Sequence, residues 1–131
     1  MAQENVEIVR AAIDALNKGD LDAWLKEAAP DYEFDFSRAV GPLHGVFRLD
    51  QMERFWSELT EPWESVRMGA DELIDAGEHV VGTLAGSNRG RDGIEVTSLT
   101  TWVWTFREGK IARLCYYQDK AEALEAAGLS E

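Results

Sequence analysis

The stretch Ile94-Glu-Val-Thr-Ser-Leu-Thr-Thr-Trp-Val-Trp-Thr-Phe-Arg107, continued by Glu108-Gly109 and Lys110-Ile-Ala-Arg-Leu-Cys-Tyr-Tyr-Gln-Asp119, decides the fold. β-Branched and aromatic residues fill both arms, and the glycine stands where a tight turn needs a positive φ, so the stretch predicts a long β-hairpin. Side chains alternate between the two faces of a strand. One face of the first arm therefore carries small hydroxyls beside large aromatic rings, namely Ser98, Thr100, Trp102, Trp104 and Phe106. Such a mixture is typical of a wide core or of the floor of an apolar pocket with a few polar anchors.

The composition limits the class of protein. The chain has 131 residues, 45% of them hydrophobic, so we expect one domain spanning residues 1–131 with a substantial core. Its net charge of −12 repels phosphate backbones, which argues against a nucleic-acid partner. Neither a membrane span nor a signal peptide is recognisable in the sequence. Because Cys115 is the only cysteine, no intrachain disulfide can form, and we expect a cytoplasmic location.

Upstream of the hairpin, hydrophobic spacing predicts helices over residues 3–17, 21–25 and 50–59, the second closed by Pro30. Asp50 and Glu53 have the spacing of a capping box for the third helix, which Pro62 should stop. A period of two from residue 31 predicts a strand, and further strands are expected over residues 63–75 and 79–88. Asp119 and Glu122 have capping-box spacing for a short last helix.

This order of elements predicts an α+β fold, with one strongly curved antiparallel sheet wrapped around the N-terminal helices and a short C-terminal helix. Glycines inside the expected strands, at Gly69, Gly82 and Gly86, suit the bulges or bends that curve a sheet. A sheet bent in this way leaves a cone whose wide end can stay open.

Four segments carry a resemblance to a known family. They are Glu4-Asn-Val-Glu-Ile-Val-Arg10, Ala15-Leu-Asn-Lys-Gly-Asp-Leu-Asp22, Trp104-Thr-Phe-Arg-Glu-Gly-Lys-Ile111, and Tyr117-Gln-Asp119 with Glu122-Ala-Leu-Glu-Ala-Ala-Gly-Leu129. Together the segments resemble the SnoaL-like polyketide cyclase family of the nuclear transport factor 2-like superfamily, which also includes ketosteroid isomerases and limonene epoxide hydrolases. The resemblance implies a cone-shaped α+β barrel, an apolar pocket and often a homodimer joined through the sheet. It does not by itself imply a reaction.

The catalytic residues of these relatives carry over only in part. Asp35 falls where a ketosteroid isomerase keeps its proton-shuttling aspartate, but Ala12 and Trp102 stand in place of its oxyanion-hole tyrosine and protonated aspartate. The arginine and two aspartates of the epoxide hydrolases are not supplied. Asp119 falls at the position of the cyclases' acid/base aspartate, and Trp102 replaces a histidine that is common in SnoaL-like sequences.

Four residues are therefore catalytic candidates, each with a plainer alternative. Asp35 is either a pocket acid with a raised pKa or a carboxylate on a solvated strand face. Asp119 is either an acid/base group or the cap of the last helix. Tyr116 could donate a hydrogen bond to a substrate oxygen, or serve as a core tyrosine. His44, in the loop of residues 38–45, could act at the rim of the pocket or simply be solvated.

The last strand presents a choice of register. Burying Arg113 without a partner would be costly, so we expect Leu114, Tyr116 and Gln118 to face inward. With these we expect a ligand-binding wall made of Trp24, Phe34, Phe55, Trp56, Trp63, Thr100 and Trp102. The two histidines, His44 and His79, are far apart in sequence and belong to no ligand cluster, so the sequence predicts neither a metal site nor a cofactor.

Three functions remain open from the sequence. The chain binds a small apolar or aromatic molecule and catalyses proton transfer on a compact carbonyl compound, as an isomerase or cyclase does. Alternatively, it is a non-catalytic ligand-binding or dimerisation module, or a hydratase or hydrolase in which Asp35 and Asp119 face one cavity. A strand face bearing Leu99, Thr101 and Val103 predicts a homodimer through the sheet.

Overall fold

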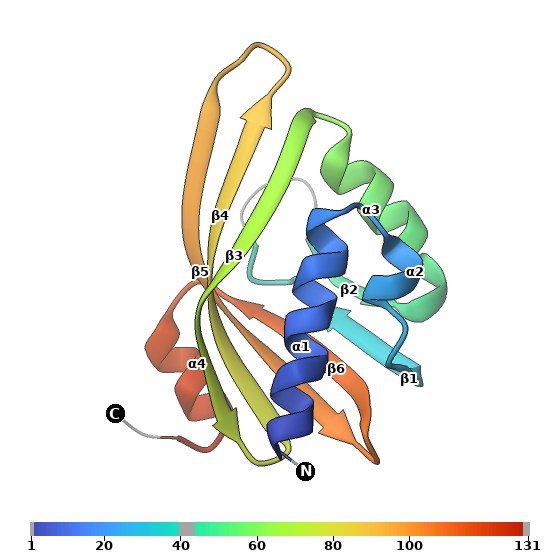
Figure 1. Ribbon diagram of the computed structural model, residues 1–131, viewed down its shortest axis with the longest axis vertical. Coiled ribbons are helices and arrows are strands. Elements are labelled where there is room, and N and C mark those ends of the chain that lie inside the picture. Colours follow the sequence, from blue (N-terminus) through green and yellow to red (C-terminus); the bar gives the residue numbers. More distant parts are fainter. Residues whose placement is uncertain (1, 40–43, 130–131) are drawn as a thin grey trace.

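The computed structural model describes residues 2–39 and 44–129 and confirms the predicted α+β fold (Figure 1). Four helices, a 3₁₀ turn and six strands follow one another along the chain. They are α1 (Ala2–Asn17), α2 (Leu21–Trp24), β1 (Ala28–Asp35), β2 (Val46–Arg48), the 3₁₀ turn Leu49–Gln51, α3 (Met52–Thr60), β3 (Trp63–Ala76), β4 (His79–Gly90), β5 (Glu95–Arg107), β6 (Lys110–Tyr117) and α4 (Lys120–Ala126). None of these helices has the length and apolar sequence that a membrane span needs.

The predicted hairpin forms the middle of the sheet. The strand order is β2-β1-β6-β5-β4-β3, and β5 pairs antiparallel with both β4 and β6. Glu108 and Gly109 join β5 to β6 with φ values of 54° and 79°. Two consecutive positive φ values are those of a type I′ turn, whose twist matches that of the strands.

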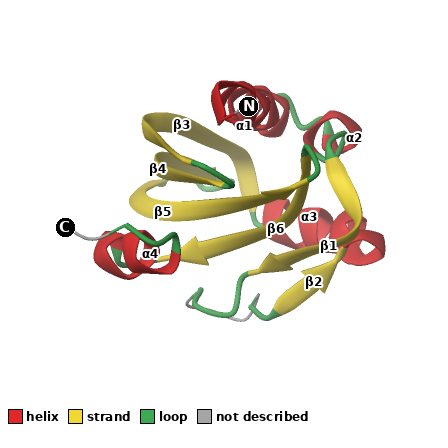
Figure 2. Cartoon of the chain, turned by 90° about the horizontal axis from the view of Figure 1, so that it is seen from below, coloured by secondary structure: helices red, strands yellow, loops and turns green. Residues whose placement is uncertain are grey.

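The sheet separates two hydrophobic cores. Its inner face, which carries Trp102 and Trp104, packs against α1, α2 and α3. Its outer face, which carries Val103 and Cys115, packs against α4. Figure 2 shows α1 and α4 on opposite sides of the sheet. Both faces of the sheet centre are therefore buried, a condition that alternating hydrophobicity alone does not reveal.

The cover provided by α4 corrects the prediction of an exposed face. Thr101 and Val103 are only 3% and 4% exposed, while Leu99, further along β5, is 64% exposed. The part of the outer face that remains accessible is therefore the half nearer the β4–β5 turn, which extends beyond the helices in Figure 1.

Strand β1 differs from the prediction in two respects. It begins at Ala28, so Pro30 lies inside the strand instead of closing α2. The proline is tolerated because the pairing with β6 is irregular between Ala28 and Glu33, where no regular ladder hydrogen bond is required. The β1–β6 pair is also parallel, whereas the other pairs in the sheet are antiparallel. The three-residue strand β2 was not predicted, because it is too short to show a period.

Two predicted capping boxes take other forms. Helix α3 is preceded by the 3₁₀ turn, where the Arg48 backbone N–H donates to Gln51 Oε1 at 2.8 Å, so Asp50 is not its cap. Asp119 does cap α4, accepting from the Ala121 backbone N–H at 3.0 Å. Glu122 does not close a box there, because its carboxylate accepts from Arg38 Nε at 3.1 Å.

Asn17 fastens the end of α1 to the edge strand β3. Its Nδ2 donates to the Met68 carbonyl, the Met68 N–H donates to Asn17 Oδ1, and both distances are 2.7 Å. The side-chain amide thus satisfies two backbone groups that an edge strand would otherwise leave unpaired. The contact holds α1 over the inner face, where the candidate site lies.

Candidate functional site

A cavity of about 150 Å³ lies between the inner face of the sheet and helices α1, α2 and α3. Most of its wall is aromatic or aliphatic, and four lining residues are polar but uncharged. The lining residues are Leu16, Trp24, Phe36, Phe55, Leu59, Val66, Met68, Asn88, Ser98, Thr100, Trp102 and Tyr116. Among these described residues there is no acid, base or histidine, so the cavity suits an uncharged occupant.

The polar groups of the cavity come from three adjacent strands. Thr100 Oγ1 accepts from Trp102 Nε1 at 2.8 Å, which leaves the threonine hydroxyl free to donate. The side chains of Asn88, Ser98 and Tyr116 make no hydrogen bond to the residues that the structure describes. Burial raises the pKa of Tyr116, so its hydroxyl stays protonated at neutral pH and can donate. The cavity therefore offers donors to an oxygen atom of an occupant.

The floor of the cavity is an aromatic stack. The Trp102 ring is nearly parallel to the rings of Phe34 and Trp104, with centroid distances of 5.6 Å and 6.2 Å and interplanar angles of 21° and 22°. Tyr116 meets Trp102 edge-on at 5.6 Å and 85°. Offset-stacked and edge-to-face pairs of this kind are the favoured arrangements of aromatic rings.

Two glycines of β4 leave room for this inner face. A Cβ at Gly82 would lie 2.8 Å from Leu73 Cδ2 and 2.9 Å from Trp104 Cζ3. A Cβ at Gly86 would lie 2.6 Å from Ser98 Oγ. The absence of side chains at these positions is therefore what admits the tryptophan ring and the serine hydroxyl.

Asp35 does not reach the cavity. It lies on the outer face and is only 7% exposed, so it is neither the pocket acid nor the solvated carboxylate that the sequence predicted. Its Oδ2 accepts from Arg113 Nη2 at 2.6 Å, and its Oδ1 accepts from the Ser37 backbone N–H at 3.0 Å. The next residue, Phe36, is the one that lines the cavity.

The environment of Asp35 keeps it ionised. Burial by itself would raise its pKa, but hydrogen bonds from the Ser37 hydroxyl and backbone N–H and the charges of Arg113 and Arg38 outweigh burial and lower it. Arg38 in turn lies over the Tyr117 ring, 4.6 Å from its centroid, and bonds Glu122 of α4. Asp35 is thus part of a structural ion-pair group between β1, β6 and α4.

Within β6 the side chains have the predicted orientation, which was based on the cost of burying Arg113 without a partner. Arg113 faces outward and is paired with Asp35, while Leu114 is buried in the inner core and Tyr116 lines the cavity. The prediction for Gln118 is wrong: it is exposed beyond the end of β6, and its Nε2 donates to the Arg38 carbonyl at 2.8 Å.

The other catalytic candidates also lie outside the cavity. Asp119 is exposed and caps α4, and His44 is exposed in the loop before β2. Neither belongs to the described lining, and nor does Asp35, so the structure does not bring two carboxylates to this cavity. In the part of the chain that is described, no three His, Cys, Asp or Glu residues are grouped closely enough to hold a metal ion.

The predicted aromatic wall is partly present. Trp24, Phe55, Thr100 and Trp102 line the cavity, whereas Phe34 is fully buried behind it. Trp56 packs on Trp24 with centroids 5.8 Å apart, and Trp63 lies outside, in a surface groove with Pro62, Ile94 and Val96. The sequence prediction missed the lining residues Leu16, Phe36, Leu59, Val66, Met68, Asn88 and Ser98. Alternation along β5 places Ser98 on the correct face, but the residues from the helices and from β3 converge only through tertiary contacts.

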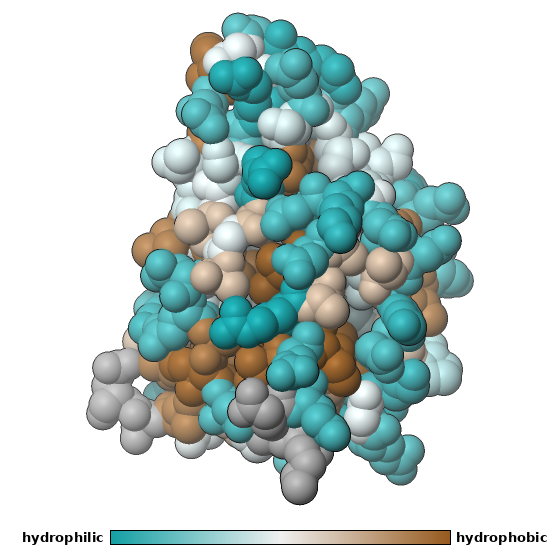
Figure 3. All heavy atoms as spheres, viewed as in Figure 1, coloured by the Kyte–Doolittle hydropathy of each residue, from teal (hydrophilic) through white to brown (hydrophobic). Residues whose placement is uncertain are grey.

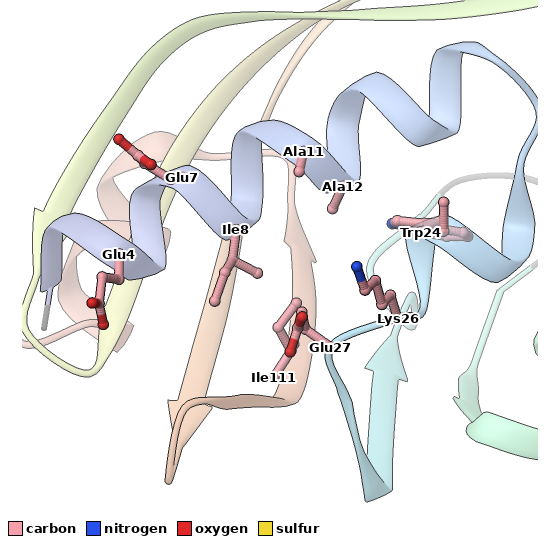
Figure 4. A pocket seen from close by; sticks show the side chains of 10 residues that line it. Glu4, Glu7, Ile8, Ala11, Ala12, Trp24, Lys26, Glu27 and Ile111 are labelled. Carbon is pink, nitrogen blue, oxygen red and sulfur yellow. The ribbon is translucent and has the colours of Figure 1, made fainter.

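A second hollow of about 290 Å³ lies on the surface beside α1 and shares Trp24 with the cavity (Figure 4). Its floor is apolar, at Ile8, Ala11 and Ile111, and its rim carries charged side chains, namely Glu4, Glu7, Lys26 and Glu27. The molecular face in Figure 3 is largely hydrophilic, with hydrophobic atoms showing between the polar side chains. We take the inner cavity as the candidate site because aromatic side chains line it and because three of its polar side chains make no hydrogen bond within the described part of the chain.

Comparisons with known proteins agree with this architecture. A family model described as "SnoaL-like domain" matches residues 9–114. TerC, co-crystallised with polyporic acid, is 22% identical with a TM-score of 0.79, over 95% of this chain and 98% of its own. An NTF2-like protein from Burkholderia thailandensis is 27% identical with a TM-score of 0.77, over 92% and 95% of the two chains. The Δ5-3-ketosteroid isomerase from Mycobacterium sp. is 16% identical with a TM-score of 0.73, over 87% and 92%. A search of curated proteins finds no match.

Replacing Asp35 with asparagine should destabilise the protein at about pH 7 by about 1–3 kcal/mol, because Arg113 loses its charged partner. The folded-state pKa of Asp35 is lowered, so its stabilisation is complete above the unfolded-state value of about 3.9 and is lost as pH falls through the folded-state value. The difference between wild type and Asp35→Asn should therefore shrink towards about pH 3, as measured by urea unfolding.

The matched control is Asp31→Asn, on the same strand. Asp31 also pairs with an arginine, Arg107, at 2.6 Å, but the pair is exposed, so a much smaller loss is expected. A stabilised Asp35→Asn at neutral pH would contradict this account and indicate a strained acid.

Proposed function

The chain belongs to the SnoaL-like domain family, and we propose that its inner cavity binds one compact, uncharged apolar or aromatic molecule that carries a carbonyl or hydroxyl oxygen. The observation that carries the proposal is the uncharged lining, in which three polar side chains without a hydrogen-bond partner among the described residues meet an aromatic wall. The apolar body of the ligand would pack on Trp24, Phe55 and Trp102. Its oxygen would accept a hydrogen bond from Tyr116, whose raised pKa keeps it a donor.

The family fold supports an isomerase- or cyclase-like role as well as a ligand-binding role. Proton transfer next to a carbonyl needs a base within hydrogen-bond reach of the substrate. The described lining supplies a donor for the oxygen but no such base, and Asp35 and Asp119 are both engaged elsewhere. We therefore favour binding without proton transfer. A base supplied by Asp35 or Asp119 is the second candidate and would need a rearrangement of β1 or α4.

The expected affinity is modest. Burying about 150 Å² of apolar ligand surface is worth about 4 kcal/mol, and each hydrogen bond adds about 1 kcal/mol. Loss of ligand freedom on binding reduces this sum, so dissociation constants of about 1 mM or weaker are expected for simple probes. Ligand-detected NMR is suited to affinities in this range.

Cyclohexanone should bind to the wild-type protein in saturation-transfer NMR, and Tyr116→Phe should weaken binding about 5- to 10-fold through loss of one hydrogen bond. Tyr32→Phe is the matched control, because Tyr32 is buried in the inner core and does not line the cavity. Equal affinities of wild type and Tyr116→Phe for cyclohexanone would contradict the proposed hydrogen bond from Tyr116 to the ligand oxygen. No binding of cyclohexanone or phenol at about 10 mM would overturn the proposed function.

We also propose, as the sequence predicts, that the chain is cytoplasmic and that two copies associate through the accessible half of the outer face. Leu99 lies opposite Ala85 in the ladder there, and both are exposed. Replacing Leu99 with lysine should shift the protein to monomer in light scattering at micromolar concentration, because a charge would enter the interface. A wild-type protein that is already monomeric would contradict the proposed dimer.

A further inference from the structure

We infer that Trp102 limits the cavity to molecules with a single ring and excludes fused two-ring compounds. The inference rests on the proposed function and specifies its ligand class. Trp102 stands in the middle of β5, between Gly82 on β4 and Tyr116 on β6, and its ring forms the floor against which a ligand would lie.

The volume of the cavity is the first reason to expect this size limit. At about 150 Å³ it has the size of an apolar cavity that holds one benzene molecule. The Trp102 side chain is itself a fused two-ring system. The space that it occupies is therefore comparable to that of the additional ring that a larger ligand would bring.

The second reason is that aromatic contacts and a hydrogen bond hold the Trp102 side chain in place. Phe34 and Trp104 stack against its ring, and Tyr116 meets it edge-on. Its Nε1 donates to Thr100 Oγ1 at 2.8 Å, which also fixes the rotation of the ring in its plane. The side chain is 6% exposed. To admit a second ring, Trp102 would have to leave two stacked neighbours and a hydrogen bond at once, each worth about 0.5–1.5 kcal/mol.

The neighbours behind the ring leave it little space for retreat. Phe34, Leu84 and Leu114 belong to the same core and are at most 1% exposed, and Trp104 fills the space that Gly82 leaves open. Close-packed interiors do not accommodate a displaced indole without strain elsewhere. Trp102 is thus a specificity-determining residue, and Thr100 is the residue that positions it.

The test compares two neutral phenols of different size, phenol and 2-naphthol, by saturation-transfer and titration NMR. Wild type should bind phenol and bind 2-naphthol at least about tenfold more weakly. Trp102→Ala should reverse this preference, because the vacated space admits the second ring. Trp63→Ala is the size-matched control: it removes a tryptophan that does not line the cavity and should retain the wild-type preference.

Trp102→Phe keeps an aromatic ring in the stack and should give an intermediate preference. If Trp102→Ala does not show cooperative thermal unfolding, Trp102→Phe replaces it in the comparison with wild type. Equal binding of the two phenols by wild type, or no gain in 2-naphthol binding by the folded variants, would overturn the size limit while leaving the proposed function intact. If wild type binds neither cyclohexanone nor phenol, the proposed function fails. A gain in 2-naphthol binding by the Trp102 variants would still support the size limit.

Discussion

The ion pair between Asp35 and Arg113 determines which side chains of the neighbouring strands β1 and β6 face the inner core and which face outward. Side chains alternate along a strand, so a charged pair on the outer face directs Phe34, Phe36, Leu114 and Tyr116 inward. The two strands run parallel and in register there, with Phe34 beside Leu114 and Asp35 beside Cys115. A shift of one residue in either strand would bring a carboxylate or a guanidinium into the aromatic core without a partner, which is strongly unfavourable. The uncharged cavity is a consequence of this assignment.

The same constraint places the charged groups and the candidate site on opposite faces of the sheet. Charged groups gather on the outer side, where Arg38 links Asp35, Glu122 and the Tyr117 ring, and where α4 covers the sheet. Burial raises the pKa of Tyr117 to about 12, so that this tyrosine also remains neutral in the cluster. The inner side is left to aromatic packing and neutral donors. Phe36, the residue that follows β1, lines the cavity, whereas the preceding Asp35 faces the outer side.

Much of the fold could be predicted from the sequence because its signals are local. The β5–β6 hairpin follows from Glu108-Gly109 and its flanking β-branched residues, and the cap of α4 follows from Asp119. The burial of Asp35 was not predicted, for a physical reason. A period of two shows that a strand has two different faces, but it does not show that Arg38 and Arg113 cover the polar one. Gln118 was assigned inward because the end of β6, at Tyr117, leaves no mark in the hydrophobic pattern.

The floor of the cavity was predictable from strand β5, which carries it. Alternation along β5 places Ser98, Thr100 and Trp102 on one face, and the structure finds all three in the lining. Leu16, Leu59 and Met68 come from three other elements, and their convergence depends on contacts such as the clasp of Asn17 on Met68. No local pattern encodes which helix residue will meet which strand. The size of the cavity depends on Gly86 and on the orientation of Trp102, and both are properties of the packed state.

The central claim is that the site binds its ligand with uncharged groups alone. The most direct measurement is the affinity of wild-type protein for cyclohexanone, which does not titrate, between about pH 5 and pH 8. We expect an affinity that changes by less than about twofold, since Tyr116 is the titratable residue in the described lining and burial raises its pKa. A change of about tenfold or more with a midpoint in this range would contradict the account, because it would place a carboxylate or an imidazole in the site.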